Sequence, residues 1–561
     1  MKTLTYNNQT IKNTRMLINL SFFLALVFCV PSISVAAPGT ELIKDINQGA
    51  KASNIFNLDA GSQRLFFMAD DGSNGMEVWT SNGAIENAER LTDTSIGTNV
   101  ATELRYSNKN NNIVVNNIYY FSLRSNETRE HELWRSDGSV SGTFKLIDLP
   151  DYLDDRTPAA GADGLYYFVP WSDPDYGREL WVSDGTIAGT RMVKDINPGT
   201  GSSSPHDLME ANDRLYFLVG NDLWTSDGTS GGTRLLANLG GHYTEDMRYI
   251  THVNGTIYLA FLSGQSGTPY ELWRHDIDSG QTLRVKGFDG FASDGQNYTA
   301  VGDLLFFVAK GIDSDTFDLW KSDGSPDGTI LVKKGPYRGA IGSMDLTNVD
   351  GTLFFIGSDE EHGRELWKSN GTASGTFMVK DINGTHYGSD LNCFTAVGNT
   401  LFFVQKKTNY VKNLWMSDGT EAGTMMTDMG VSNLKCPVNF NEQLYFYGND
   451  RTNKDFGTEL YRYNLSDNEP VVPVAPEVGV STNGIKVTIS WNGIANADGY
   501  TLYFAPYPFT GPETIGNFDL GNTTNFSIDL WNGAAYYIAI TSRHSDLESA
   551  YSNIGLFIIR K

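Results

Sequence analysis

One polar and aromatic stretch of the chain carries side chains suited to binding a sugar. Trp171 and Tyr176 lie five residues apart, with Asp173 and Asp175 between them. Aromatic rings stack on the apolar faces of sugars, and carboxylates accept hydrogen bonds from sugar hydroxyls. We therefore take these four residues as a candidate ligand-binding site. The alternative is an ordinary polar surface loop.

Histidines at three positions raise the question of a metal site. His206, His242 and His386 each lie where one repeat of the chain passes into the next, so we expect them at one rim of the fold. His386 belongs to a distant repeat, whereas His206 and His242 flank a single one. We include His206 and His242 among the candidate ligand-binding residues. Unrelated surface histidines are the alternative, and we predict no metal site.

No constellation of catalytic residues is recognisable. Acids such as Asp154-Asp155 and Glu360-Glu361 are sequence neighbours that point in different directions, so neither forms an acid/base pair by its spacing. A Ser-Asp-Gly turn recurs along the chain, but one Asp per turn does not supply the converging oxygens that calcium needs. Its Asp is expected to accept hydrogen bonds from its own turn amides. We predict no cofactor; calcium binding at these turns is the alternative, and nothing in the sequence supports it.

The elements that must position these residues belong to a repeat that dominates the chain. Its core reads Glu-Leu-Trp-x-Ser-Asp-Gly-Thr at 179–186 and recurs with Asn in place of Asp at 365–372. The aromatic marker recurs 43 to 55 residues apart, at Trp79, Trp134, Trp181, Trp224, Trp273, Trp320, Trp367, Trp415 and, degenerately, Tyr461. Units of this length are typical of four-stranded propeller blades.

Each unit divides into four strands. In the seventh unit we expect strands at 345–349, 352–356, 365–368 and 376–382, with a tight turn at Asp350-Gly351. Gly, Pro or Asn-Gly interrupts every periodic run, so no helix is predicted. The fold class is therefore all-β.

The two ends of the repeat region predict closure. Residues 40–47 copy a fourth strand such as 192–197, whereas the ninth unit has no convincing fourth strand of its own. The N-terminal strand should pair beside Leu460 and remove the exposed sheet edge. We predict a closed β-propeller of about nine four-stranded blades. Eight blades are the alternative, because the longest spacing makes the second unit irregular.

Two cysteines occupy equivalent places in neighbouring units. Cys393 and Cys436 each lie eight residues before an aromatic strand, at 401–403 and 444–446. Equivalent positions in adjacent blades bring two thiols together, and an oxidising compartment would favour their bond. We predict a Cys393–Cys436 disulfide. Two buried free thiols are the alternative.

The repeated octapeptides resemble the bacterial ELWxxDGT repeat family over residues 40 to about 465. The turn is lost at 275–278 and at 461–464. The resemblance implies an exported repeat protein, often joined to other extracellular modules. It brings no established activity, so no catalytic residue is carried over.

The repeat domain is assigned to residues 38–466, and a proline-rich linker to 467–476. Residues 477–561 change to longer alternating strands and resemble a fibronectin type III domain, a β-sandwich in which Trp491 would lie in the core.

Residues 1–36 read as a signal peptide, since basic residues precede an apolar run that ends in small residues. A retained membrane anchor is the alternative. No later stretch is apolar enough to span a bilayer, so we expect no membrane span in the mature form. The net charge of −24 repels phosphate backbones, so nucleic acid is not expected as a partner.

These features predict an exported, non-catalytic binding or adhesion protein that is secreted, periplasmic or on the cell surface. We expect a monomer that recognises extracellular carbohydrate or protein through the loop-rich face of the propeller. One alternative is a secreted polysaccharide hydrolase or lyase that uses carboxylates or histidines at the axial funnel. Another is a structural exoprotein of the envelope or biofilm matrix. The fold alone does not choose among them.

Overall fold

The protein is represented by a computed structural model. It describes residues 39–48, 51–92, 112–124, 130–149, 151–153, 160–240, 248–262, 270–291, 298–312, 314–335, 345–407, 411–427, 431–432, 434–450, 458–464, 476–494, 497, 499–509, 511, 514–544, 547–549 and 551–560. Strands are the only long elements in these ranges, and the all-β class is confirmed. The expected signal peptide, nearly all of the linker and His242 lie outside the described residues.

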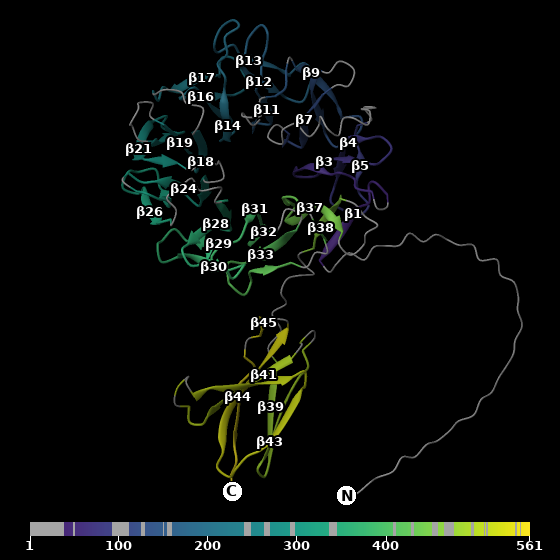
Figure 1. Cartoon of the computed structure of the whole chain (residues 1–561), viewed down its shortest axis with the longest axis vertical. Helices are drawn as coiled ribbons and strands as arrows, with labels where there is room; N and C mark the ends of the chain where they lie inside the picture. The colour runs from purple at the N-terminus through teal and green to yellow at the C-terminus, as the bar shows by residue number, and fades with distance from the viewer. Residues whose placement is uncertain are drawn as a thin grey trace, which may run out of the picture. The chain divides into compact units, whose positions relative to one another are not determined.

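The repeat region forms nine antiparallel sheets within the described residues, numbered here 1 to 9 in chain order (Figure 1). Sheet 1 contains β2 (Phe56–Ala60), β3 (Leu65–Asp70), β4 (Met76–Ser81) and β5 (Glu89–Arg90). Sheet 2 contains β6 (Ile113–Val115), β7 (Ile118–Arg124), β8 (His131–Ser136) and β9 (Phe144–Leu149). Sheet 3 contains β10 (Ala160–Ala162), β11 (Leu165–Phe168), β12 (Leu180–Ser183) and β13 (Arg191–Lys194). Sheets 4 and 5 contain β14 (His206–Ala211), β15 (Arg214–Val219), β16 (Asp222–Ser226) and β17 (Arg234–Ala237); and β18 (Arg248–Val253), β19 (Thr256–Leu262), β20 (Tyr270–Asp276) and β21 (Thr282–Phe288).

Sheets 6 and 7 contain β22 (Gly290–Phe291), β23 (Tyr298–Val301), β24 (Leu304–Lys310), β25 (Phe317–Ser322) and β26 (Ile330–Lys333); and β27 (Thr347–Val349), β28 (Thr352–Asp359), β29 (Gly363–Ser369) and β30 (Thr376–Lys380). Sheets 8 and 9 contain β31 (Leu391–Val397), β32 (Thr400–Lys406), β33 (Lys412–Ser417) and β34 (Met425–Met426); and β35 (Val431–Ser432), β36 (Val438–Phe440), β37 (Gln443–Asp450) and β38 (Thr458–Tyr463), with β1 (Thr40–Lys44).

The N-terminal strand pairs with the last strand of the repeat region, as predicted. β1 runs antiparallel to β38, with Leu42 opposite Tyr461 and Lys44 opposite Leu460. Figure 1 shows β1 beside β37 and β38 although the rest of the repeat region separates them in sequence. Sheet 9 is therefore built from both ends of the repeat region.

Two sheets depart from the predicted four strands. In sheet 6 both β22 and β23 pair with β24, and in sheet 9 both β35 and β36 pair with β37. The middle strands β24 and β37 have seven and eight residues and extend past the short first strand, so a further two-residue strand pairs with their far ends.

Two strand ends in sheet 7 also differ from prediction. Asp345 has a φ of +45°, which does not fit an extended strand, and β27 begins at Thr347. The predicted fourth strand ends early, at Lys380, because the amide of Ile382 donates to the Glu365 carboxylate.

Hydrophobic contacts link each sheet to the next. The second strand of most sheets carries two adjacent aromatic residues, and successive strand residues point to opposite faces. In β32, Phe403 packs in the cluster shared with sheet 7, whereas Phe402 packs in the cluster shared with sheet 9. Every pair of successive sheets shares such a cluster, and Leu65 of sheet 1 packs with Leu460 of sheet 9.

Hydrogen bonds within the Ser-Asp-Gly-Thr turn explain why its residues recur. In sheet 3 the Ser183 hydroxyl accepts from the Gly185 amide at 3.1 Å and contacts the Thr190 hydroxyl at 2.7 Å. Asp184 accepts from the Thr186 amide at 2.9 Å and from its hydroxyl at 2.7 Å. The predicted role of this Asp as a turn-forming residue is confirmed. The Ser183 hydroxyl and the Asp184 carboxylate thus bond within the turn, and we assign the recurring turn a structural role.

In sheets 3 and 7 the Glu of the repeat holds the crossing that leads to the next sheet. Glu179 is fully buried and accepts from the amides of Ile196 and Ser203 at 3.0 and 2.9 Å and from the Ser203 hydroxyl at 2.6 Å. Glu365 accepts from the Ile382 amide and the Ser389 hydroxyl in the same way. Burial of this carboxylate is therefore compensated by donors from the crossing segment.

A disulfide joins sheets 8 and 9, as predicted. It links Cys393 in β31 to Cys436 before β36, with a Cα–Cα distance of 5.1 Å.

The C-terminal residues form a β-sandwich. One sheet contains β39 (Val478–Asn483), β40 (Lys486–Trp491) and β43 (Asn525–Asp529), and the other contains β41 (Gly499–Pro506), β42 (Gly516–Gly521), β44 (Ala535–His544), β45 (Leu547–Glu548) and β46 (Gly555–Ile558). Trp491 packs with Leu502, Ile538 and Ile540 in a core shared by the two sheets.

Candidate ligand-binding site

The loop between β11 and β12 is shaped by one of its own predicted site residues. A carboxylate oxygen of Asp173 accepts from the amides of Asp175 and Tyr176 at 2.9 and 3.1 Å. The Asp173 carbonyl accepts from the Gly177 amide at 2.8 Å. Asp173 therefore orders the loop through an Asx turn. The side chains of Asp175 and Tyr176 are exposed, and 43% of Tyr176 is accessible.

Trp171 is only partly accessible, because two side chains lie against its ring. The Tyr152 ring stacks with the indole at a centroid distance of 5.2 Å and an angle of 17°. The Arg178 guanidinium lies 4.4 Å from the indole centroid. The Trp171 amide also donates to the Tyr152 carbonyl at 2.8 Å. These contacts fix the indole in one orientation.

Residues 151–153 lie against the Trp171 loop and add an aromatic ring and a carboxylate to its surface. Tyr152 is 37% exposed, and His131 of β8 meets its ring edge-on at 6.0 Å. The Ser172 hydroxyl donates to Asp151 at 3.3 Å. We call Asp151, Tyr152, Trp171, Asp175 and Arg178 the Tyr152 platform.

Sequence reasoning missed Asp151, Tyr152 and Arg178 as members of this platform. Arg178 directly precedes the repeat Glu, and that adjacency to a motif was the available signal for it. No local sequence pattern indicated that Tyr152 would contact Trp171. Tyr152 precedes sheet 3, and it reaches the loop between β11 and β12 through tertiary contacts alone.

Of the two candidate histidines, only His206 lies within the described residues. His206 begins β14, where its Nδ1 lies 2.8 Å from Asp207 and its Nε2 lies 3.0 Å from the Gly220 carbonyl. These bonds fit a histidine that holds its own sheet together. His386 is exposed in the crossing between sheets 7 and 8, where it contacts Tyr387. Among the described residues, no group of three or more His, Cys, Asp or Glu is placed to hold a metal ion.

Two buried carboxyl groups have strongly shifted pKa values. Burial raises the pKa of Glu365 to about 7 and that of Glu459 to about 8. Both side chains are fully buried and accept hydrogen bonds from crossing segments, so their geometry is that of structural groups.

The described residues define an all-β repeat protein with a C-terminal β-sandwich. None of them lies in a helix with the length and apolar character needed to cross a bilayer. No model of a known protein family matches the sequence, and no curated protein matches it.

Solved structures match parts of the chain at low sequence identity. A myokine structure is 18% identical over 16% of this chain and 99% of its own, with a TM-score of 0.14. The fn3 domain of human collagen alpha-1(XX) chain is 16% identical over 17% of this chain and 93% of its own, with a TM-score of 0.15. A study of two prolyl endopeptidases supplies a structure that is 9% identical over 82% of this chain and 57% of its own, with a TM-score of 0.37. TM-scores this low support no argument about the fold or the activity of this chain.

Proposed function

We propose that the chain is an exported, non-catalytic binding protein that recognises carbohydrate through the Tyr152 platform. The observation that supports this most directly is the stacked Tyr152–Trp171 pair in a surface loop region. The partly exposed Tyr152 ring offers an apolar face for a pyranose, and the acceptors Asp151 and Asp175 lie in the segments that carry the two rings. The ordered loop holds these groups in place before a ligand arrives.

We further propose that the nine sheets are the blades of a closed β-propeller with ELWxxDGT-type repeats. The circuit of shared clusters from sheet 1 to sheet 9 and back, together with the β1–β38 pairing, supports closure. The C-terminal sandwich is proposed to be of the fibronectin type III kind.

Export is supported by two further observations. The disulfide between Cys393 and Cys436 is typical of an oxidising compartment. Cleavage of the proposed signal peptide after Ala36 would leave β1 intact, since it begins at Thr40.

A glycan array probed with the full chain tests the proposed function. We expect saturable binding to one class of glycan. We expect Tyr152→Ala to lower the affinity at least about tenfold, because the variant loses one well-placed contact with the sugar. Tyr387→Ala is the matched control, because Tyr387 is an exposed tyrosine on a different crossing. A blank array together with capture of a protein ligand would contradict the carbohydrate assignment, and release of new reducing ends from a polysaccharide would contradict the non-catalytic one.

A further inference from the structure

The outer face of one sandwich sheet has a hollow that the strand register creates. On this face of β41 and β44, Tyr503 lies opposite Ala539, and Ala505 lies opposite Tyr537. Residues two apart on a strand share a face, so two tyrosines stand diagonally across a floor of two alanines. The short alanine side chains leave space that larger residues would fill.

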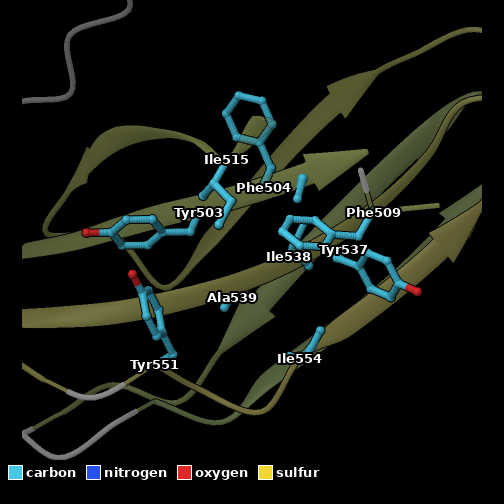
Figure 2. Close-up of a pocket in the computed structure, with 10 residues that line it drawn as sticks. Tyr503, Phe504, Phe509, Ile515, Tyr537, Ile538, Ala539, Tyr551 and Ile554 are labelled. Carbon is cyan, nitrogen blue, oxygen red and sulfur yellow. The ribbon is translucent and has the colours of Figure 1, made fainter. Parts of the chain in front are cut away.

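Aromatic side chains from outside these strands extend the walls. The Tyr551 ring meets the Tyr503 ring edge-on at 4.9 Å and 88°, and Phe509 is 50% exposed. Figure 2 shows Tyr503 and Tyr551 on one side of Ala539, and Tyr537 with Phe509 on the other. The pocket has a volume of about 420 Å³, and the described residues that line it include no Asp, Glu, Lys, Arg or His.

The lining restricts what the pocket can bind. A volume in this range suits a small molecule. The lining is almost entirely apolar, so a charged or polyhydroxylated ligand would lose hydration there without compensation. The net charge of −24 further disfavours anions. The Tyr503 and Tyr551 rings already meet edge-to-face, and an inserted aromatic ring can make the same kind of contact with them. A saturated ring has no π system and cannot make this contact.

We propose that this pocket is a binding site for a small, uncharged aromatic molecule of one or two rings. The site is separate from the Tyr152 platform and does not depend on the proposed carbohydrate function.

Calorimetric titration of the full chain with three matched probes tests this site. 2-Naphthol is the neutral aromatic probe, decahydro-2-naphthol is its saturated counterpart, and 2-naphthoate is its anionic counterpart. We expect 2-naphthol to bind with a dissociation constant on the order of 0.1 mM, a value in keeping with the affinity per atom of small ligands. The saturated probe should bind at least about tenfold more weakly, and the anion should not saturate.

Two substitutions locate the site. Ala539→Leu places a larger side chain on the pocket floor, and Tyr551→Ala removes part of one wall at a position that is 60% exposed. Each should weaken 2-naphthol binding at least about tenfold while the melting temperature stays within a few degrees, as is usual for surface substitutions. Ser481→Leu, on an exposed position of the other sheet, is the matched control and should leave the affinity unchanged.

Four outcomes would overturn the proposal. They are no saturation by 2-naphthol at millimolar concentration, equal affinity for the saturated probe, unchanged affinity in both pocket variants, and concentration-dependent dimerisation that Ala539→Leu abolishes. The last outcome would identify the pocket as an interface between two copies of the chain. None of them bears on glycan binding at the Tyr152 platform.

Discussion

The carboxylate of Glu459 accepts hydrogen bonds from both the hydroxyl and the amide of Ser53, which lies 406 residues away in the sequence. The hydroxyl bond is 2.6 Å long and the amide bond is 3.1 Å long. Glu459 also accepts from the amide of Ile46, which lies two residues after the end of β1. The same Glu position in sheets 3 and 7 holds the crossing that follows its own fourth strand. In sheet 9 the crossing that Glu459 holds contains Ile46 and Ser53, which come from the opposite end of the repeat region.

The first prediction concerns pH. Burial raises the pKa of Glu459 from 4.5 to about 8 in the folded protein. A raised pKa means that this group contributes stability fully below about pH 4.5 and loses it as the pH rises through about 8. Thermal unfolding should therefore show a melting temperature that falls as the pH rises from about 4.5 to about 8.

Variants assign that loss to individual carboxyls. A pKa difference of one corresponds to about 1.4 kcal/mol, so Glu459→Gln should remove a few kcal/mol of the stability that is lost between about pH 4.5 and about pH 8. Glu365→Gln should flatten the decline only up to about pH 7, because the pKa of that carboxyl in the folded protein is about 7. Glu421→Gln, at an exposed position, is the control. Identical pH profiles for all variants would contradict the assignment.

The second prediction concerns the packing of the N-terminal strand. Ile43 is fully buried in the cluster shared by sheets 9 and 1. Ile43→Ala removes buried methyl groups and leaves a cavity, so it should lower the free energy of unfolding by about 2–4 kcal/mol. Urea denaturation measures this change, with Lys51→Ala at an exposed site as the control. A cost below about 0.5 kcal/mol would mean that β1 contributes little to the fold.

The third prediction concerns the disulfide. The two cysteines are separated by 43 residues, and sheets 8 and 9 also share a hydrophobic cluster. Replacing both cysteines by serine should lower the free energy of unfolding by about 2–4 kcal/mol, since the unfolded chain gains freedom. Reducing agent should destabilise the native protein by a similar amount and leave the double-serine variant unchanged. Equal sensitivity of both proteins to reduction would contradict the prediction.

The fourth prediction separates backbone strain from packing between sheets. Gly228 and Gly255 both have positive φ values, +81° and +77°. A Cβ at Gly228 would lie 2.7 Å from Leu165 of the preceding sheet, whereas a Cβ at Gly255 would meet nothing within 4 Å. Gly255→Ala should cost about 1 kcal/mol through strain alone. Gly228→Ala should cost up to about 1 kcal/mol more, because the end of the Leu165 side chain must shift. Equal costs would show that the turn glycine does not serve the contact between sheets.

Much of the repeat architecture could be predicted from residue spacing. The spacing of the Trp-marked units predicted one sheet for each unit. The copy of a fourth strand at residues 40–47 predicted the β1–β38 pairing, and the equivalent repeat positions of Cys393 and Cys436 predicted their disulfide. These features follow from local turn chemistry and from alternation along strands, both of which near neighbours in sequence determine. The role of Glu459 was not foreseen, because its donors come from the far end of the repeat region.

The ligand-binding surfaces depended on the tertiary structure. Sequence placed Trp171 in a variable loop, but only folding brought Tyr152 and Arg178 against its ring, because loops from different segments meet through contacts that no local pattern encodes. The pocket on the sandwich likewise depends on which residues of β41 and β44 lie opposite one another. A shift of one residue in the pairing of these strands would move Tyr503 or Tyr537 to the opposite face of the sheet. Residue order thus determined the repeating frame of this protein, whereas cross-strand register and loop packing decided where a ligand can meet it.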